Sequence, residues 1–437
     1  MLALNIPSSL SIATAMDQAA WITDKLVPII VQHGSFNNRN KGRTDIISCE
    51  VTPKKNEDHY MSNAFFINVL LKFEADSPER YYMMIKRPQE DPYIRQFLNT
   101  EVLFHNETLI YTQMIPLMEE FLKKRVSFSI QSIFPTCYYA RSDSAPDEDV
   151  VVLGDLKPEG FRTTEMKVFL DYDHCVLALR ALGRLHAVSY GMKNLEGSAF
   201  RTIISKLRVQ TFANSSESDI DLFFKKTTLR AVKYFARGKG VDQTVVKKLK
   251  DKFSKCSELL VQLLTPKEPL TVMCHGDFCR NNMMFRYDEC GKPCEVKFFD
   301  LQVVTYASPA IDVSFFAYLN MSSELREQHW DDLFKEYHTS VVNNLADILR
   351  CPVDDLMQNF SLKKFQKDFS DHAVYGFLHS SFFLPFIMTN AKKQVKWEEI
   401  FSGGLVEIAD TSVELGGEEA TVKLADILKD LVNRSAI

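Results

Sequence analysis

A short polar segment, Cys-His-Gly-Asp-Phe-Cys-Arg-Asn-Asn at residues 274–282, limits what this chain can fold into more than any other part of it. Asp277 is followed five positions later by Asn282, and Asp300 comes directly after the strand-like run 296–299. An acid, an amide and a second acid in this order are typical of sites that transfer a phosphoryl group from ATP. There the first carboxylate takes the proton of an acceptor hydroxyl, and the other two groups hold Mg²⁺ on the phosphates. The sequence therefore predicts Asp277 as the base and Asn282 and Asp300 as metal ligands.

The two residues in front of Asp277 fit this interpretation. Gly276 allows the backbone to bend where a Cβ would crowd it, and we expect His275 to brace the loop. The alternative is an ordinary loop between two strands that carries polar residues. The order and spacing of the three groups favour the catalytic interpretation.

From Cys274 to Gln302, and on through Ser308-Pro-Ala-Ile-Asp312, the sequence resembles the insect ecdysteroid-kinase-like (CHK-kinase-like) proteins. These are relatives of choline kinases and aminoglycoside phosphotransferases, and the resemblance covers roughly residues 40–400. It implies an α+β, bilobal protein-kinase-like fold with a small β-rich N-lobe and a large, mainly helical C-lobe. It also implies ATP-dependent phosphorylation of a small-molecule hydroxyl, on an alcohol such as an ecdysteroid or a dietary xenobiotic.

The predicted order of elements also fits two lobes. A helix should start at Pro92, which suits a first helical turn, and run to Met114 before Pro116 stops it. Composition and periodicity predict strands at 44–52, 60–73, 81–87, 134–139 and 150–153, and helices at 172–190, 215–237, 241–264 and 324–349. We expect a helical lead-in over residues 1–40, an N-lobe over 41–153, and a C-lobe over 154–437 that holds the catalytic segment 274–302.

Lys86 lies on the third predicted strand. Alternation places it on the same face as Met84, and a lysine on that strand positions the α- and β-phosphates in kinases. A lone strand lysine is more often a surface residue, but its place ahead of the catalytic segment favours the phosphate role. The family's Phe-x-x-Glu-x-x-x-Tyr pattern matches at Glu107, so the resemblance implies that Glu107 is the partner of Lys86. Glu101 is the alternative partner.

Two segments depart from the family's pattern. The turn Asn56-Glu57-Asp58-His59 stands where glycines usually let backbone amides approach phosphate, and its two acids add negative charge. Ser62, or the amides of residues 58–62, could serve instead. Gly154 replaces the usual hinge glutamate before Asp155-Leu156, whose backbone is expected to hold adenine. The acidic turn keeps open a second hypothesis, a catalytically silent binding protein (a pseudokinase).

Composition limits the partners of the chain. Its 437 residues are 46% hydrophobic and 25% charged, as in soluble globular proteins. A net charge of −5 argues against a nucleic-acid binder, which normally shows a basic patch. No signal peptide is evident, and the most apolar run, 373–388, is too short to span a bilayer, so we expect a cytoplasmic protein with no membrane contact.

Nine scattered cysteines are typical of reduced thiols. Cys274, Cys279, Cys290 and Cys294 suggest zinc, but neither pair has the C-x₂-C spacing. A protein kinase is disfavoured because no Ala-Pro-Glu follows Asp300.

The remaining candidates have structural interpretations. Asp312 should cap a helix or tie down the catalytic loop, and His186 should be a packed helix histidine. Phe377, Phe382, Phe383 and Phe386 either line an apolar acceptor pocket or belong to the core.

Overall fold

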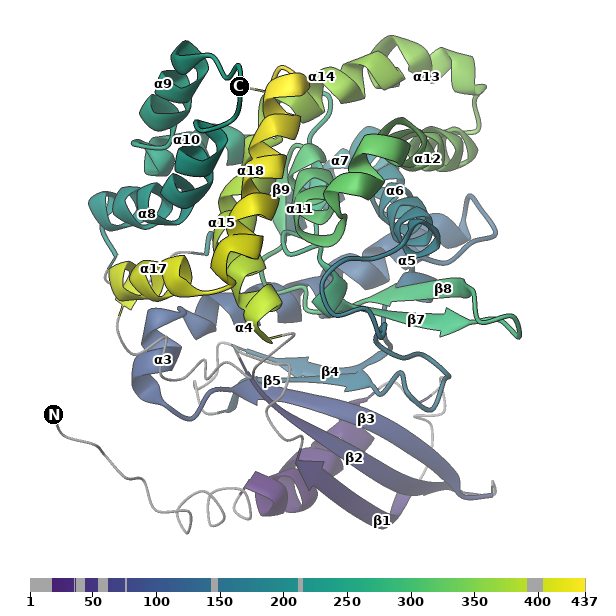
Figure 1. Ribbon diagram of the computed structural model, residues 1–437. Coiled ribbons are helices and arrows are strands. Elements are labelled where there is room, and N and C mark those ends of the chain that lie inside the picture. Colours follow the sequence, from purple (N-terminus) through teal and green to yellow (C-terminus); the bar gives the residue numbers. More distant parts are fainter. Residues whose placement is uncertain are drawn as a thin grey trace, which may run out of the picture. The chain divides into compact units, whose positions relative to one another are not determined.

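The computed structural model describes residues 18–34, 36, 44–53, 62–74, 77–142, 148–210, 215–390 and 404–436 (Figure 1). Its contacts divide the chain into two compact units. The first, here the sheet unit, comprises Met1–Glu90 and Pro135–Glu159; the second, the helical unit, comprises Asp91–Phe134 and Gly160–Ile437. A small antiparallel sheet in one unit and mostly helices in the other confirm the expected α+β, kinase-like fold class.

The sheet unit holds one five-stranded antiparallel sheet in the order β1-β2-β3-β5-β4. The five strands lie where β-branched and aromatic residues predicted them. Their bounds are Thr44–Pro53 for β1, Ser62–Phe73 for β2, Glu79–Pro88 for β3, Cys137–Arg141 for β4 and Val150–Gly154 for β5.

The core of this unit forms between one face of the sheet and the N-terminal helix. A π-helical turn, Ile22–Leu26, continues into α2, Val27–His33, and its apolar side packs on the sheet. Tyr81, Met83 and Ile85 alternate along β3 and belong to this core. These helical residues lie inside the segment 1–40, for which the sequence predicts a helical lead-in.

Alternation along β3 places Lys86 on the opposite face of the strand from that core. It pairs in register with Ala64 of β2 and Val151 of β5, and only 6% of its surface is exposed. A lysine is rarely buried without a charged partner. Lys86 is therefore not the solvated surface residue of the alternative interpretation.

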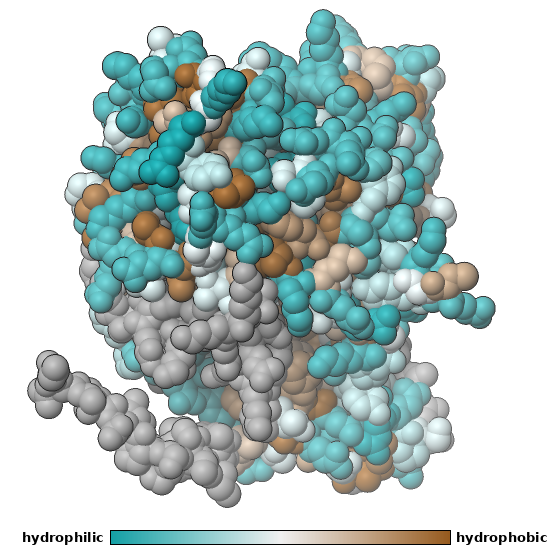
Figure 2. Space-filling view, in the orientation of Figure 1, coloured by the Kyte–Doolittle hydropathy of each residue, from teal (hydrophilic) through white to brown (hydrophobic). Residues whose placement is uncertain are grey.

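The helical unit holds the remaining helices. In chain order they are α3 Pro92–Phe97, α4 Thr100–Leu109, α5 Ile115–Lys123, α6 Tyr172–Leu195, α7 Gly197–Ile204, α8 Glu217–Phe235, α9 Gln243–Lys252, α10 Cys256–Leu264, α11 Ala310–Asn320, α12 Ser323–Leu349, α13 Val353–Phe360, α14 Leu362–His372, α15 Val374–Asn390, α17 Gly404–Glu414 and α18 Gly417–Asn433. On the face drawn in Figure 2 this unit carries mostly hydrophilic residues. None of the described helices combines the length and the apolarity that crossing a bilayer requires.

The prediction of one helix from Pro92 to Met114 was wrong at both ends of α4. The chain leaves the helix at Asn99, whose φ is +51°, before α4 begins. Pro116 does not stop the helix, because a π-helical turn, Ile110–Met114, leads into α5 and places the proline in its first turn. The wider π-helical turn accommodates the proline, which cannot donate to a carbonyl of the preceding turn.

Two short sheets hold residues 274–302, the segment predicted to be catalytic, inside the helical unit. β6, Val272–Cys274, pairs with β9, Thr305–Ala307, and β7, Met283–Tyr287, pairs with β8, Pro293–Phe298. Both pairs are antiparallel, so the loop after β6 and the loop after β8 each stay attached to a strand pair. The long helices α6 and α12 pack side by side in the same unit (Figure 1).

Residues 91–134 group with the helices, and residues 135–159 group with the sheet. The division expected from the sequence, at residues 40 and 153, concerned lobes along the chain. The domain boundaries at residues 40 and 153 therefore stay a prediction.

Candidate active site

The loop between β6 and β7 brings Asp277 and Asn282 together. The Asn282 side-chain N–H donates to the carboxylate of Asp277 at 2.8 Å and to its backbone carbonyl at 2.9 Å. A 3₁₀ turn, Arg280–Asn282, brings the chain back, and the Arg280 backbone N–H is held by Asn320 Oδ1 at 2.8 Å. The spacing of five residues thus places the amide of Asn282 against the partly buried Asp277 carboxylate.

Asp300 follows β8 in an unusual backbone conformation. Its φ is +68°, in the left-handed region that few non-glycine residues adopt, although aspartate tolerates it better than most. Such backbone strain is concentrated at functional sites. Burial, and then the charge of Asp300, raise the pKa of Asp277, while His275, Asn282 and Cys279 oppose the shift. The two carboxylates therefore share one electrostatic site.

Gly276 is required by the local backbone. Its φ is +86°, and a Cβ at this position would collide with the backbone carbonyl of Val303. Next to it, the His275 ring donates from Nε2 to the carbonyl of Phe299 at 3.1 Å, immediately before Asp300. The ring also packs against Phe278. His275 thus links the Asp277 loop to the segment that ends at Asp300.

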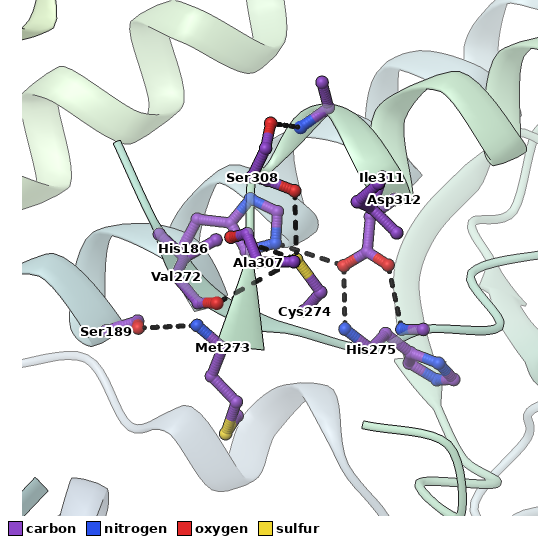
Figure 3. Close-up of polar contacts among 12 residues, drawn as sticks. His186, Ser189, Val272, Met273, Cys274, His275, Ala307, Ser308, Ile311 and Asp312 are labelled. Carbon is purple, nitrogen blue, oxygen red and sulfur yellow. Dashed lines mark hydrogen bonds and ion pairs between the residues drawn. The ribbon is translucent and has the colours of Figure 1, made fainter. Parts of the chain in front are cut away.

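Asp312, in the first turn of α11, holds the loop through its carboxylate (Figure 3). Its carboxylate accepts the backbone N–H of His275 at 2.7 Å and that of Gly276 at 2.9 Å. Asp312 has no exposed surface, so these bonds satisfy a buried charge. The expectation that Asp312 ties down the catalytic loop is confirmed.

His186 of α6 completes the support of Asp312. Its Nε2 lies 3.2 Å from the Asp312 carboxylate, and its Nδ1 lies 2.8 Å from the Tyr337 hydroxyl of α12. Gly183, one turn earlier, allows this approach, because a Cβ there would lie 2.8 Å from the Tyr337 carbonyl. His186 is fully buried, as predicted, but its contact with Asp312 could not be foreseen from α6 alone.

His186, Cys274 and Asp312 form a group of metal-ligating side chains within 4.8 Å of one another. Each has a protein partner: the Cys274 thiol donates to the Ser308 carbonyl at 3.3 Å, and both Asp312 oxygens accept backbone N–H groups (Figure 3). This group therefore has the character of a hydrogen-bonded support. The four cysteines considered for zinc divide into two buried ones and two exposed ones, Cys290 and Cys294.

The donor set at Asn282 and Asp300 suits Mg²⁺. Because the Asn282 amide nitrogen donates to Asp277, its oxygen Oδ1 faces away, and no described residue donates to it. An amide oxygen and a carboxylate are the hard ligands that Mg²⁺ takes alongside phosphates and water. Asn282 and Asp300 therefore have the ligand chemistry that Mg²⁺ requires.

The residues predicted to bind the nucleotide divide between the two units. Glu107 on α4 is 1% exposed, whereas Glu101 is exposed, so burial favours Glu107 over its alternative. Its neighbour Asn106 donates to the Gln302 carbonyl at 3.3 Å, which links α4 to the segment after Asp300. The pairing of Glu107 with Lys86 stays a prediction.

In the sheet unit, the expected hinge residues follow β5. The Asp155 backbone N–H donates to the Tyr82 carbonyl at 3.0 Å, and the Asp155 carboxylate accepts the Lys157 N–H at 3.1 Å. Leu156 is buried. Ser62 begins β2, with its side chain outside the described structure, and the acidic turn 56–59 lies outside the described residues.

The four phenylalanines considered as pocket residues separate into two kinds. Phe377 and Phe386 have no exposed surface and belong to the core, while Phe382 and Phe383 are partly exposed. Tyr375 and His379 of the same helix were not predicted from the sequence as possible pocket residues. Their spacing to Phe382 and Phe383 places all four side chains on one face of a helix and could have indicated them.

The chain matches the model of one protein family over much of its length. Residues 56–350 match the model of the ecdysteroid kinase-like family. No curated protein sequence matches the chain significantly.

Similar solved structures include an ethanolamine kinase from Plasmodium vivax, 12% identical with a TM-score of 0.38, covering 84% of this chain and 80% of that one. A GDP and kanamycin complex of APH(2")-IIia is 11% identical with a TM-score of 0.38, covering 84% and 93%. An aminoglycoside phosphotransferase from Alicyclobacillus acidocaldarius is 10% identical with a TM-score of 0.33, covering 87% and 92%. Because the family match spans more than half of the chain, the protein belongs to the ecdysteroid kinase-like family of small-molecule phosphotransferases.

Proposed function

We propose that the protein is an ATP-dependent O-kinase that phosphorylates a hydroxyl of an ecdysteroid-like or xenobiotic alcohol. One observation carries the proposal: the Asn282 amide contacts the Asp277 carboxylate at 2.8 Å within the electrostatic reach of Asp300. A base, an amide and a second acid in one small volume are what phosphoryl transfer requires. Family membership supports the same reaction class.

In this proposal Asp277 orients the acceptor hydroxyl and takes its proton. Burial and the Asp300 charge raise the pKa of Asp277 and make it a better proton acceptor than an exposed aspartate. Asn282 holds one oxygen of that carboxylate, which leaves the other for the hydroxyl. His275 and Asp312 keep the loop in place through the contacts described above.

The nucleotide would be held by residues of both units. We assign phosphate binding to Lys86 with Glu107 as its partner, adenine binding to the backbone of Asp155 and Leu156, and phosphate covering to Ser62. Asn282 and Asp300 would hold Mg²⁺, which neutralises charge on the phosphates when bound.

A catalytically silent kinase-fold binding protein is the second candidate. The acidic turn Asn56-Glu57-Asp58-His59 favours it, because two carboxylates near phosphates weaken nucleotide binding. Against it, the sequence has Asp277, Asn282 and Asp300, the three groups that we assign to the chemistry. For this reason the kinase is the stronger candidate.

A thermal-shift titration with ATP, with and without Mg²⁺, tests the proposal, followed by turnover with a panel of steroid and phenolic alcohols. A ligand that binds only the folded state raises the melting temperature. The kinase predicts a Mg²⁺-dependent shift and ADP formation that requires an alcohol. A shift without turnover on any alcohol would favour the silent binder, and no shift at all would refute nucleotide binding.

A further inference from the structure

Four side chains of α15 lie on one face of that helix. Tyr375, His379, Phe382 and Phe383 follow the spacing that repeats along one side of an α-helix, and we call them the aromatic row. The rings are in contact: those of Tyr375 and His379 are 4.1 Å apart, and those of Phe382 and Phe383 are 4.9 Å apart. Tyr375 is nearly buried, whereas the other three are partly exposed.

Rings from two other helices flank the aromatic row. Phe315 of α11 lies 5.7 Å from the His379 ring and 6.0 Å from the Phe383 ring. Phe224 and Phe223 of α8 approach His379 and Phe382 at 6.1 Å and 5.3 Å. The surroundings of the row are thus apolar on both sides.

The row begins beside the catalytic loop. Gly376 packs so closely on α11 that a Cβ there would collide with the Ser314 carbonyl. Tyr375 lies in the field of the loop's acids, because burial, then the charges of Asp312 and Asp277, raise the pKa of its phenol. From Tyr375 to Phe383 the helix rises about 12 Å, which is the reach of a multi-ring molecule.

His379 is the partly exposed polar side chain of the row, whereas the phenol-bearing Tyr375 is nearly buried. Nδ1 of His379 lies 3.0 Å from the Tyr375 carbonyl, and since a carbonyl can only accept, Nδ1 carries the proton. In the neutral ring Nε2 is then an acceptor, and no described residue donates to it. Burial lowers the pKa of His379 to about 4, so the ring is neutral near pH 7.

The composition of α15 excludes a charged recognition site on this helix. Its 17 residues contain no aspartate, glutamate, lysine or arginine. Recognition of a cationic alcohol would call for carboxylates, and recognition of an anionic one would call for basic groups. The aromatic row offers apolar rings, the phenol of nearly buried Tyr375 and the imidazole of partly exposed His379.

From this geometry we infer that the aromatic row binds the acceptor alcohol, and that the acceptor is an apolar multi-ring molecule with a second hydroxyl that donates to His379 Nε2. The inference rests on the proposed function, because the first hydroxyl is the one presented to Asp277. The rings of Phe382 and Phe383 cover the apolar body, and His379 selects the second hydroxyl. An analogue without the second hydroxyl would cover His379 Nε2 and leave this acceptor unpaired, so it should bind more weakly.

The test uses two rigid steroids as probes: androstanediol, with a hydroxyl at each end, and androstanol, which lacks one of them. Equilibrium dialysis against the full-length protein measures both dissociation constants. The wild type should bind the diol roughly five- to tenfold more tightly, the size of one hydrogen bond. His379→Phe keeps an aromatic ring and removes the acceptor, so it should abolish this preference.

Two further variants separate the roles. Phe382→Ala with Phe383→Ala should weaken both steroids several-fold and keep the diol preference, because the lost contacts are apolar. His329→Phe is the matched control, since His329 is another partly exposed helix histidine beside an aromatic ring, on α12. It should change neither constant.

The inference is overturned if the wild type binds neither steroid, if it does not prefer the diol, or if His379→Phe retains the preference. The ATP-induced thermal shift, measured on the same samples, separates this failure from that of the proposed function. A normal Mg²⁺-dependent shift without steroid binding overturns the inference alone. Loss of the shift in the wild type overturns the proposed function.

Discussion

Asp312 accepts the backbone N–H of His275 at 2.7 Å, so a carboxylate with no exposed surface fixes the start of the loop that carries Asp277. Replacing it with asparagine keeps the size but removes the charge that serves two backbone donors. Asp312→Asn should lower the free energy of unfolding by about 3 kcal/mol, the usual cost of disrupting buried hydrogen bonds to a charged group. Urea unfolding checks this, with Asp251→Asn as an exposed control that should leave stability nearly unchanged.

Gly276→Ala tests the backbone geometry in front of the base. Two costs add at this site: the left-handed φ of +86° and the collision with the Val303 carbonyl. Gly291 provides a control, because its φ is +77° and a Cβ added there would meet nothing within 4 Å. Gly291→Ala should cost only the backbone term, roughly 1 to 2 kcal/mol. Gly276→Ala should cost more and reduce turnover at least about tenfold; equal stability losses would contradict the collision.

Asp277→Asn should retain ATP binding and lose phosphoryl transfer. The expected loss is roughly two to four orders of magnitude, which is the usual contribution of a general base. Turnover and the ATP-induced thermal shift are measured together. Transfer near the wild-type rate would remove Asp277 from the role of base.

Asp300→Ala should abolish the Mg²⁺-dependence of nucleotide binding. Asp300 is the carboxylate whose charge reaches the Asp277 site, and a second carboxylate is what holds the metal in this chemistry. The measurement is the ATP thermal shift across a Mg²⁺ titration. An unchanged Mg²⁺-dependence would mean that another group binds the ion.

His379 gives a pH-dependence of stability with a definite sign. Burial lowers its pKa in the folded state from 6.5 to about 4. Between these values the unfolded chain binds a proton that the folded protein does not, so stability is full above about pH 6.5 and falls toward pH 4. At about pH 5 the loss should be on the order of 1 to 2 kcal/mol. Urea unfolding at pH 7 and pH 5 should show a smaller loss for His379→Gln than for the wild type.

Much of the site could be predicted because its residues lie close together in sequence. Asp277 and Asn282 are separated by one short loop, and the strand before Asp300 was evident from its composition. The α+β fold class followed from the same segment through the family resemblance. Local periodicity also located the strands of the sheet to within a few residues.

The rest depended on contacts between distant segments. His186 and Tyr337 are 151 residues apart in the sequence, and no local pattern on α6 or α12 predicts the contact between them. The helix around Pro116 was mispredicted because a π-helical turn lets the helix continue past the proline, and composition does not encode that turn. The inference about α15 depends on which rings of that helix are partly exposed, and exposure is a property of the packed molecule.

The backbone N–H groups of His275 and Gly276 bind Asp312 of α11, and His186 of α6 contacts Asp312 in turn. The hydrogen bond given for His379 stays within α15, on the carbonyl of Tyr375. If His379, Phe382 and Phe383 select the alcohol, mutations at three positions of one helix can exchange the substrate and leave the handling of protons and phosphate intact. Duplicated genes with this arrangement can diverge toward new compounds without passing through inactive intermediates. A single scaffold would then supply a repertoire of kinases that differ mainly along one helix face.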